Sequence, residues 1–186
     1  VVVAAGALNS AVLLLRSANE QHPNGLANSS DMVGRNFMRH KICAIVALGL
    51  KPNPTEYPKT MAINDYYWGE ADFPYPMGHF QTLGNVNEDR AATSSPPFIP
   101  SKLIPMAVFR AAAQRTTPWF LIGEDLPDPN NRISVDGTGA NSKITLAYTP
   151  NNTEAFSRLV NRWKGLLKSL NPQSVLFTTD MTLKDV

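Results

Sequence analysis

Residues 118–149, "PWFLIGEDLPDPNNRISVDGTGANSKITLAYT", decide the fold class of this chain. Three runs rich in β-branched and aromatic residues are separated by turn residues, first "DPNN" and then "GTGANS". The last run alternates apolar and polar side chains with the period of two that is typical of a strand. Because short turns join the runs, they predict strands at 118–126, 132–136 and 143–149 in antiparallel pairing.

The flanking sequence adds strands and helices to this sheet. Further strands are predicted at 42–50, 59–68 and 75–84 and in the tail from residue 173. A helix is predicted within 101–115, and another begins after Asn151 or Asn152, either of which can cap it, and ends at Asn171-Pro172. Its apolar positions recur at helical spacing: Phe156, Leu159, Val160, Trp163, Leu167 and Leu170. The pattern predicts an α+β fold, with an antiparallel sheet of about six strands and helices packed on one face.

The first sixteen residues, "VVVAAGALNSAVLLLR", follow a different pattern. Val1–Ala5 is predicted as an apolar strand of the kind that is buried in parallel sheets. A turn at Gly6 leads into an apolar helix that Asn9 or Ser10 can cap and that runs to about Ala18. Because an unpaired apolar strand is unfavourable in water, residues 1–16 are predicted to dock on their own domain or to associate with a second copy of the chain.

Composition excludes several classes of protein. The chain has 186 residues, of which 43% are hydrophobic, and a net charge of +2, which makes no case for a nucleic-acid partner. The longest uncharged apolar run, residues 1–15, is too short for a membrane segment. The single cysteine, Cys43, provides no disulfide framework, and the compartment stays open.

Sequence motifs of common sites are absent. The chain has no G-x-G-x-x-G, Walker, G-x-S-x-G or H-E-x-x-H motif. The three histidines, His22, His40 and His79, are too far apart for metal-ligand spacing, and no metal site is predicted. The strand, turn and helix around Gly6 would offer backbone amides and a helix dipole to a phosphate, although the same turn occurs structurally in every α/β protein.

The aromatic stretch "DYYWGEADFPYPMGHFQ" (65–81) is the other candidate. Alternation predicts that His79 and Gln81 share one face of a strand and Phe80 the other. Aromatic faces beside imidazole and amide groups suit polyhydroxylated ligands. The alternative, a loop packed by its own aromatic rings, stays open. Asn28-Ser29-Ser30 and Asn151-Asn152-Thr153 also match the glycosylation pattern, which often arises by chance.

Two segments, "VVVAAGALNSAVLLLRS" and "GLANSSDMVGRNFMRH", resemble the middle of the glucose–methanol–choline (GMC) oxidoreductases, which are FAD-dependent. The matching positions are Ala4, Ala5, Gly6, Ala7, Ser10, Leu13, Leu14 and Ser17, then Asn28, Ser29, Val33, Gly34, Arg35, Asn36 and His40. The chain departs from the best-known branch at Ser10-Ala11, at 17–20 and at Arg39, which points toward the sugar and gluconate dehydrogenase or pyranose oxidase side. The likeness covers nearly the whole chain and is specific in residues 1–40.

The resemblance implies a function and a set of roles. The chain would be part of a FAD-dependent oxidoreductase acting on the CH–OH group of an alcohol or sugar, with 1–32 a remnant of the FAD-binding domain and 33–186 the substrate-binding domain. Ala5, Gly6 and Ser10 would line the FAD side, and His79 and Gln81 would face the substrate. The family's catalytic histidine lies in a segment that has no match here, so no catalytic residue is expected in this chain, and the chain alone is expected to be inactive. The alternative function is a non-catalytic carbohydrate-binding or interaction domain.

Overall fold

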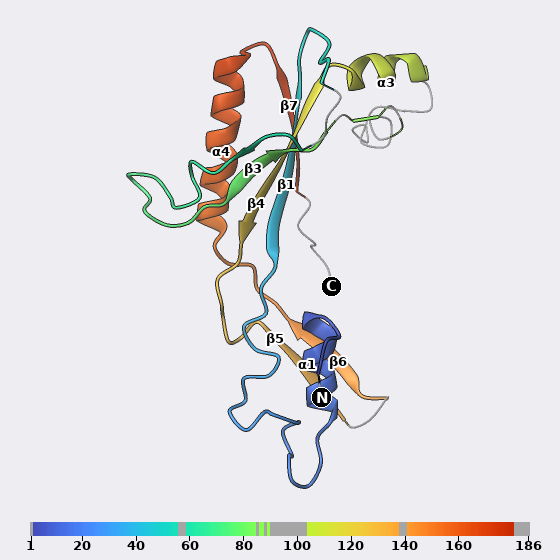
Figure 1. Cartoon of the computed structure of the whole chain (residues 1–186), viewed down its shortest axis with the longest axis vertical. Coiled ribbons are helices and arrows are strands. Elements are labelled where there is room, and N and C mark those ends of the chain that lie inside the picture. Colours follow the sequence, from blue (N-terminus) through green and yellow to red (C-terminus); the bar gives the residue numbers. More distant parts are fainter. Residues whose placement is uncertain are drawn as a thin grey trace. The chain divides into compact units, whose positions relative to one another are not determined.

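The computed structural model describes residues 2–55, 59–84, 86–87, 89, 104–137 and 141–180. The chain forms two compact units (Figure 1). The first contains the described residues of 1–39 and 125–152, and the second those of 40–124 and 153–183. The chain therefore passes from one unit to the other after residues 39, 124 and 152.

The second unit contains a five-stranded antiparallel sheet with the strand order β2-β3-β4-β1-β7. The strands are β1 (His40–Leu48), β2 (Ala62–Ile63), β3 (His79–Thr82), β4 (Thr116–Glu124) and β7 (Val175–Asp180). In the sheet centre, β1 and β4 pair over their whole length, from His40 opposite Glu124 to Leu48 opposite Thr116. The short helix α3 (Met106–Ala113) precedes β4.

The long helix α4 (Thr153–Leu170) lies along one face of this sheet (Figure 1). Its buried residues recur every four positions, namely Ala155, Leu159, Trp163 and Leu167. They pack against alternate residues of the central strands, because successive strand side chains point to opposite faces. In this core the Trp163 ring stacks on Phe80 at 4.5 Å and meets Trp119 edge-on at 4.4 Å. The predicted apolar face of this helix therefore forms the core, except that Leu170, at its last turn, is 79% exposed.

The first unit consists of helix α1 (Ala7–Arg16), an antiparallel hairpin of β5 (Arg132–Asp136) and β6 (Lys143–Ala147), and the loops between them. Helix α1 packs on β5 and buries Val12. The Arg16 guanidinium donates to the side chain and to the carbonyl of Ser142, at 2.6 and 3.1 Å. The helix thus docks on a surface of its own unit, which is one of the two outcomes predicted for residues 1–16.

The α+β architecture is confirmed, but its strands are divided between two sheets of five and two. The prediction that 118–126 pairs with 132–136 is wrong. Strand β4 uses both edges for β1 and β3, while β5 pairs with β6 in the other unit. The short turn between 118–126 and 132–136 predicted a hairpin of these two segments. In the structure β4 instead pairs with β1 and β3, which lie far from it in the sequence.

The predicted N-terminal strand and cap also need correction. Residues 2–5 belong to no strand and are exposed, and Val1 lies outside the described residues. Gly6, not Asn9 or Ser10, is the N-cap of α1, with φ +82° and no side-chain cap bond. The Ser10 hydroxyl instead accepts a hydrogen bond of 3.2 Å from the Ala5 N–H.

The observed bounds of most other elements differ from the predicted ones by a few residues or more. Of the predicted strand 59–68 only Ala62–Ile63 is a strand, because Tyr67 N–H donates to the Asn64 carbonyl in a turn. Of the predicted helix 101–115 the structure has Met106–Ala113, and residues 101–103 lie outside the described residues. Most of residues 85–98 also lie outside the described residues. Strand 132–136 is confirmed to the residue.

Candidate functional site

His79 and Gln81 lie on β3 with their side chains on the face of the sheet that is turned away from α4. Between them, Phe80 is fully buried against Trp163, whereas His79 and Gln81 are half-buried. Since side chains alternate along a strand, the two polar residues share the opposite face. In the sheet His79 stands opposite Ile122, and Gln81 stands opposite both Phe120 and Ala62.

The neighbouring strands make this opposite face mostly apolar. Residues directly across a ladder share a face, so the pairing of β1 with β4 and β7 identifies the other members. Most of them are apolar, namely Ile42, Ala44, Val46, Leu48, Pro118, Phe120, Ile122, Val175 and Phe177, and the polar members are His40, Thr116, Glu124 and Thr179. We call this surface, with His79 and Gln81 at the β3 side, the open face. Phe177 is 46% exposed there, and Ile42, Ala44 and Val46 are half-buried.

The chemistry of the open face follows from this composition. An imidazole and a carboxamide offer both donors and acceptors to hydroxyl groups. The aromatic and aliphatic side chains next to them suit the C–H surface of a small organic molecule. The surface thus combines directional polar groups with an apolar floor, which is the combination that orients a polyhydroxylated ligand.

Gly78 determines where β3 begins, a role that the sequence analysis missed. Its φ of +125° is unfavourable for any residue with a side chain, and a Cβ atom there would overlap the Ile122 carbonyl. The backbone before His79 therefore lies directly against β4. The preceding Met77 is 2% exposed in the core. The signal in the sequence is a glycine immediately before the short strand His79–Thr82.

The aromatic loop, residues 64–76, divides its rings between the interior and the surface. Tyr66 meets the buried Phe80 edge-on at 5.9 Å, and the Arg158 guanidinium lies 4.6 Å from the centre of the Phe73 ring. Trp68 and Tyr75 are 79% and 62% exposed. The inner rings thus pack on β3 and α4, whereas the ring contacts within the loop are Tyr67 with Trp68 and Phe73 with Tyr75. The exposed parts of the outer rings are available to a ligand.

The start of α1 holds the three residues that the resemblance assigned to FAD. Ala5 and Gly6 are exposed, and a Cβ built on Gly6 meets no atom within 4 Å, so another group can approach this backbone closely. The first turn of α1 carries no acidic residue and no side-chain cap. A helix start of this kind presents free backbone N–H groups to an anion.

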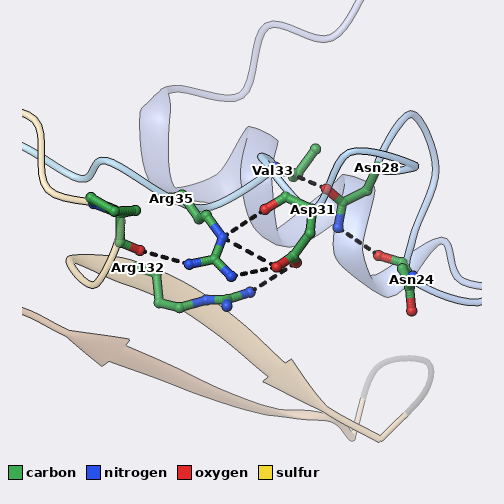
Figure 2. A network of polar contacts seen from close by, with 7 residues as sticks. Asn24, Asn28, Asp31, Val33, Arg35 and Arg132 are labelled. Atoms are coloured by element: carbon green, nitrogen blue, oxygen red, sulfur yellow. Dashed lines mark hydrogen bonds and ion pairs between the residues drawn. The ribbon is translucent and has the colours of Figure 1, made fainter.

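The segment from Asn24 to Asn36, which contains the second motif of the resemblance, is held by polar contacts (Figure 2). The buried Asn28 amide donates to the Asn24 carbonyl at 2.8 Å and accepts from the Val33 N–H at 2.9 Å. The Arg35 guanidinium pairs with Asp31, and Arg132 of β5 pairs with the same carboxylate at 3.2 Å. These partners give Asn28 and Arg35 structural roles within the first unit.

The Arg35 hydrogen bond has an electrostatic consequence. It holds the pKa of the Asp31 carboxyl below its usual range, and the charge of Arg132 adds to that effect. Asp31 stays 51% exposed, so the pair is screened by water.

A buried carboxylate, Asp125, lies where the first unit resumes after β4. Its Oδ2 accepts from the Tyr148 hydroxyl at 2.5 Å and from the Arg39 N–H at 3.0 Å. The Arg39 guanidinium lies 3.9 Å from the centre of the Tyr148 ring. Burial raises the pKa of the Tyr148 phenol, and its hydrogen bond to Asp125 raises it further. Sequence reasoning missed this cluster, because nothing local connects residues so far apart in the chain.

The remaining candidates are structural. Asn28 of the first glycosylation pattern is buried, and the Asn151 amide of the second bonds both the N–H and the carbonyl of Leu126, at 2.8 and 2.9 Å. In the described part of the chain no group of three or more His, Cys, Asp or Glu side chains could hold a metal ion. Within the same residues, no helix is long and apolar enough to cross a membrane.

Comparison with known proteins shows sequence similarity to a dehydrogenase subunit. No family model matches it. The chain is 29% identical over 135 residues to the fructose dehydrogenase large subunit of Gluconobacter japonicus. The match covers 71% of this chain and 25% of that protein, so the chain spans about a quarter of its relative's length. At a coarse level, therefore, the chain is similar to part of a dehydrogenase subunit.

Proposed function

We propose that this chain is part of a FAD-dependent oxidoreductase of the GMC type, to which it contributes the substrate-binding domain. In this proposal residues 1–32 belong to the FAD side and 33–186 to the substrate side. The reaction is oxidation of a CH–OH group of a sugar or a related alcohol. The observation that carries the proposal is the similarity to a fructose dehydrogenase large subunit over 71% of the chain.

The open face supports the substrate side of the proposal. Gln81 and His79 stand beside an apolar floor that includes Phe120 and Ile122, directly across the ladder from them. In our proposal the Gln81 carboxamide and the His79 imidazole hydrogen-bond the sugar hydroxyls, and the floor contacts its C–H groups. Their role is orientation, which lowers the entropic part of the barrier without a covalent step.

The helix start at Gly6 supports the cofactor side. The uncapped N–H groups of α1 and the open space over Gly6 fit an approaching phosphate group, and no acidic side chain of the first turn opposes it. FAD, when bound, supplies the acceptor for the hydride. Ala5 contributes its small size, which permits close approach, and Ser10 holds the Ala5 N–H and so orders the turn.

The test uses the full-length protein that carries this chain, with fructose as the probe substrate and a dye as the electron acceptor. We expect flavin absorbance in the purified protein and a KM for fructose that rises roughly 3- to 10-fold in Gln81→Ala, the effect of one lost hydrogen bond. Gln114→Ala is the matched control, because Gln114 is an exposed glutamine beyond the C-terminus of α3. A protein that binds sugar but neither carries flavin nor turns over substrate would instead support the alternative, a non-catalytic carbohydrate-binding domain.

A further inference from the structure

The outer part of the aromatic loop presents three exposed rings on the second unit. Trp68, Tyr75 and Tyr67 are 79%, 62% and 44% exposed. Tyr67 and Trp68 meet edge-on at 5.0 Å, and Tyr75 meets the inner ring Phe73 at 5.3 Å. Trp68 is the one exposed tryptophan of the chain's three, since Trp119 and Trp163 are 5% and 3% exposed.

These rings stand on a backbone that is held in place. Glu70 and Phe73 exchange two backbone hydrogen bonds of 2.9 and 3.0 Å. The Glu70 side chain, only 11% exposed, pairs with Arg162 of α4 at 2.6 Å. Arg158, also of α4, pairs with Asp72 at 3.3 Å and covers the Phe73 ring. Contacts to a long helix therefore fix the loop, and the exposure of Trp68 does not reflect a lack of packing beneath it.

Gly69 brings the two halves of the loop together. Its φ is +98°, and a Cβ atom there would lie 2.5 Å from the Phe73 carbonyl and 2.7 Å from the backbone of Tyr75. The turn that carries Tyr67 and Trp68 thus abuts the backbone of Tyr75. Because of this backbone contact we group the three exposed rings Tyr67, Trp68 and Tyr75 under one name, the aromatic tip.

We propose that the aromatic tip is a second sugar-binding site, in which the Trp68 indole stacks on the C–H face of a hexose ring. Tyr67 and Tyr75 would border the ring with their hydroxyl groups. Asp65, an exposed carboxylate in the same turn as Trp68, provides acceptors for vicinal hydroxyls. A preorganised aromatic surface loses little conformational entropy on binding. The choice of a hexose rests on the proposed function, whereas the site itself does not involve the open face.

Size and charge favour a sugar over a macromolecule. The exposed parts of the three rings amount to roughly 400 Å², about half of the ~800 Å² per partner of a stable protein interface. That area matches one or two sugar rings. Tryptophan and tyrosine are also common at membrane surfaces, but the exposed carboxylate of Asp65, in the same turn as Trp68, opposes binding to anionic lipids.

The test measures binding of D-fructose and D-glucose to the 186-residue chain by saturation-transfer NMR and by iodide quenching of Trp68. We expect transfer to the ring C–H protons, protection of Trp68 from iodide, and a dissociation constant on the order of 10 mM. The acyclic alcohol sorbitol, which lacks a ring face, should give at least about fivefold less transfer at the same concentration.

Two variants make the outcome specific. Trp68→Ala should lose at least about 80% of the transfer while its thermal unfolding stays unchanged, because the indole is exposed. Gln114→Ala, the exposed control used above, should bind as the wild type does, and Gln81→Ala should keep the protection of Trp68 from iodide, because the open face does not include Trp68. The inference fails if the wild type gives no transfer at about 50 mM sugar, if Trp68→Ala retains it, or if zwitterionic vesicles bind the chain through Trp68. It also fails if Gln81→Ala abolishes the transfer, but that result would support the open face and leave the proposed function standing.

Discussion

The Tyr148 hydroxyl donates a 2.5 Å hydrogen bond to the carboxylate of Asp125, which is 2% exposed. The same carboxylate accepts from the Arg39 backbone, and the Asp125 N–H donates back to the Arg39 carbonyl at 3.1 Å. Within the first unit, the side chain of Asp125, the residue after β4, therefore connects Arg39, the residue before β1, with Tyr148, the residue after β6. Three of the four predictions below concern contacts within this unit.

Tyr148→Phe should lower the free energy of unfolding of the first unit by about 1.5–3 kcal/mol, the range for a hydrogen bond to a charged group. The substitution removes the hydroxyl and keeps the ring, which also packs edge-on against Phe37 at 5.9 Å. Urea unfolding followed by circular dichroism measures the change. Tyr67→Phe, at an exposed ring of the second unit, is the control and should change nothing. An equal loss in both variants would contradict the role assigned to Tyr148.

Alkaline pH should weaken the same contact. The pKa of Tyr148 is raised in the folded chain, so the folded state holds the phenol proton more tightly than the unfolded state does. This contribution is fully present below the unfolded value of about 10 and is lost as pH rises through the higher folded value. Spectrophotometric titration at the phenolate band should show one tyrosine ionising later than the rest, and Tyr148→Phe should remove that late step.

Asp31 should titrate at a lower pH than an isolated aspartate, because Arg35 and Arg132 favour its charged form. The stability it contributes is present above the unfolded value of about 3.9 and is lost as pH falls through the lower folded value. Carboxyl NMR titration measures the midpoint. Arg35→Ala should raise it toward the usual range, and Arg132→Ala should raise it less, since Arg35 provides the largest effect. Arg162→Ala, in the other unit, should leave the Asp31 midpoint where it is.

Gly78→Ala should destabilise the second unit by about 2–4 kcal/mol, because a backbone with positive φ and an overlap with the Ile122 carbonyl are combined at one position. Gly165→Ala is the matched control. No atom lies within 4 Å of a Cβ at Gly165, in the interior of α4, so alanine there should stabilise by about 0.5–1 kcal/mol. Denaturant unfolding of both variants provides the comparison, and similar effects of the same sign would show that Gly78 is not constrained as we infer.

The sequence by itself determined the features that depend on local periodicity. The helix Thr153–Leu170 and the strand Arg132–Asp136 follow from the spacing of apolar side chains over one element. The placement of His79 and Gln81 on one face, opposite Phe80, follows from alternation alone. For the same reason the α+β class could be predicted without knowledge of which strand pairs with which.

Only the tertiary structure decided the pairing partners and the burial of polar groups. Strand β4 joins β1, some eighty positions earlier, rather than its neighbour β5, and Asp125 meets Arg39 over a similar separation. The apolar pattern of residues 1–16 likewise did not predict that Val2 is exposed or that Gly6 is the N-cap of α1. The physical reason is that periodicity specifies which side chains of one element share a face, whereas partner choice depends on the summed burial and hydrogen bonding of segments far apart in the chain.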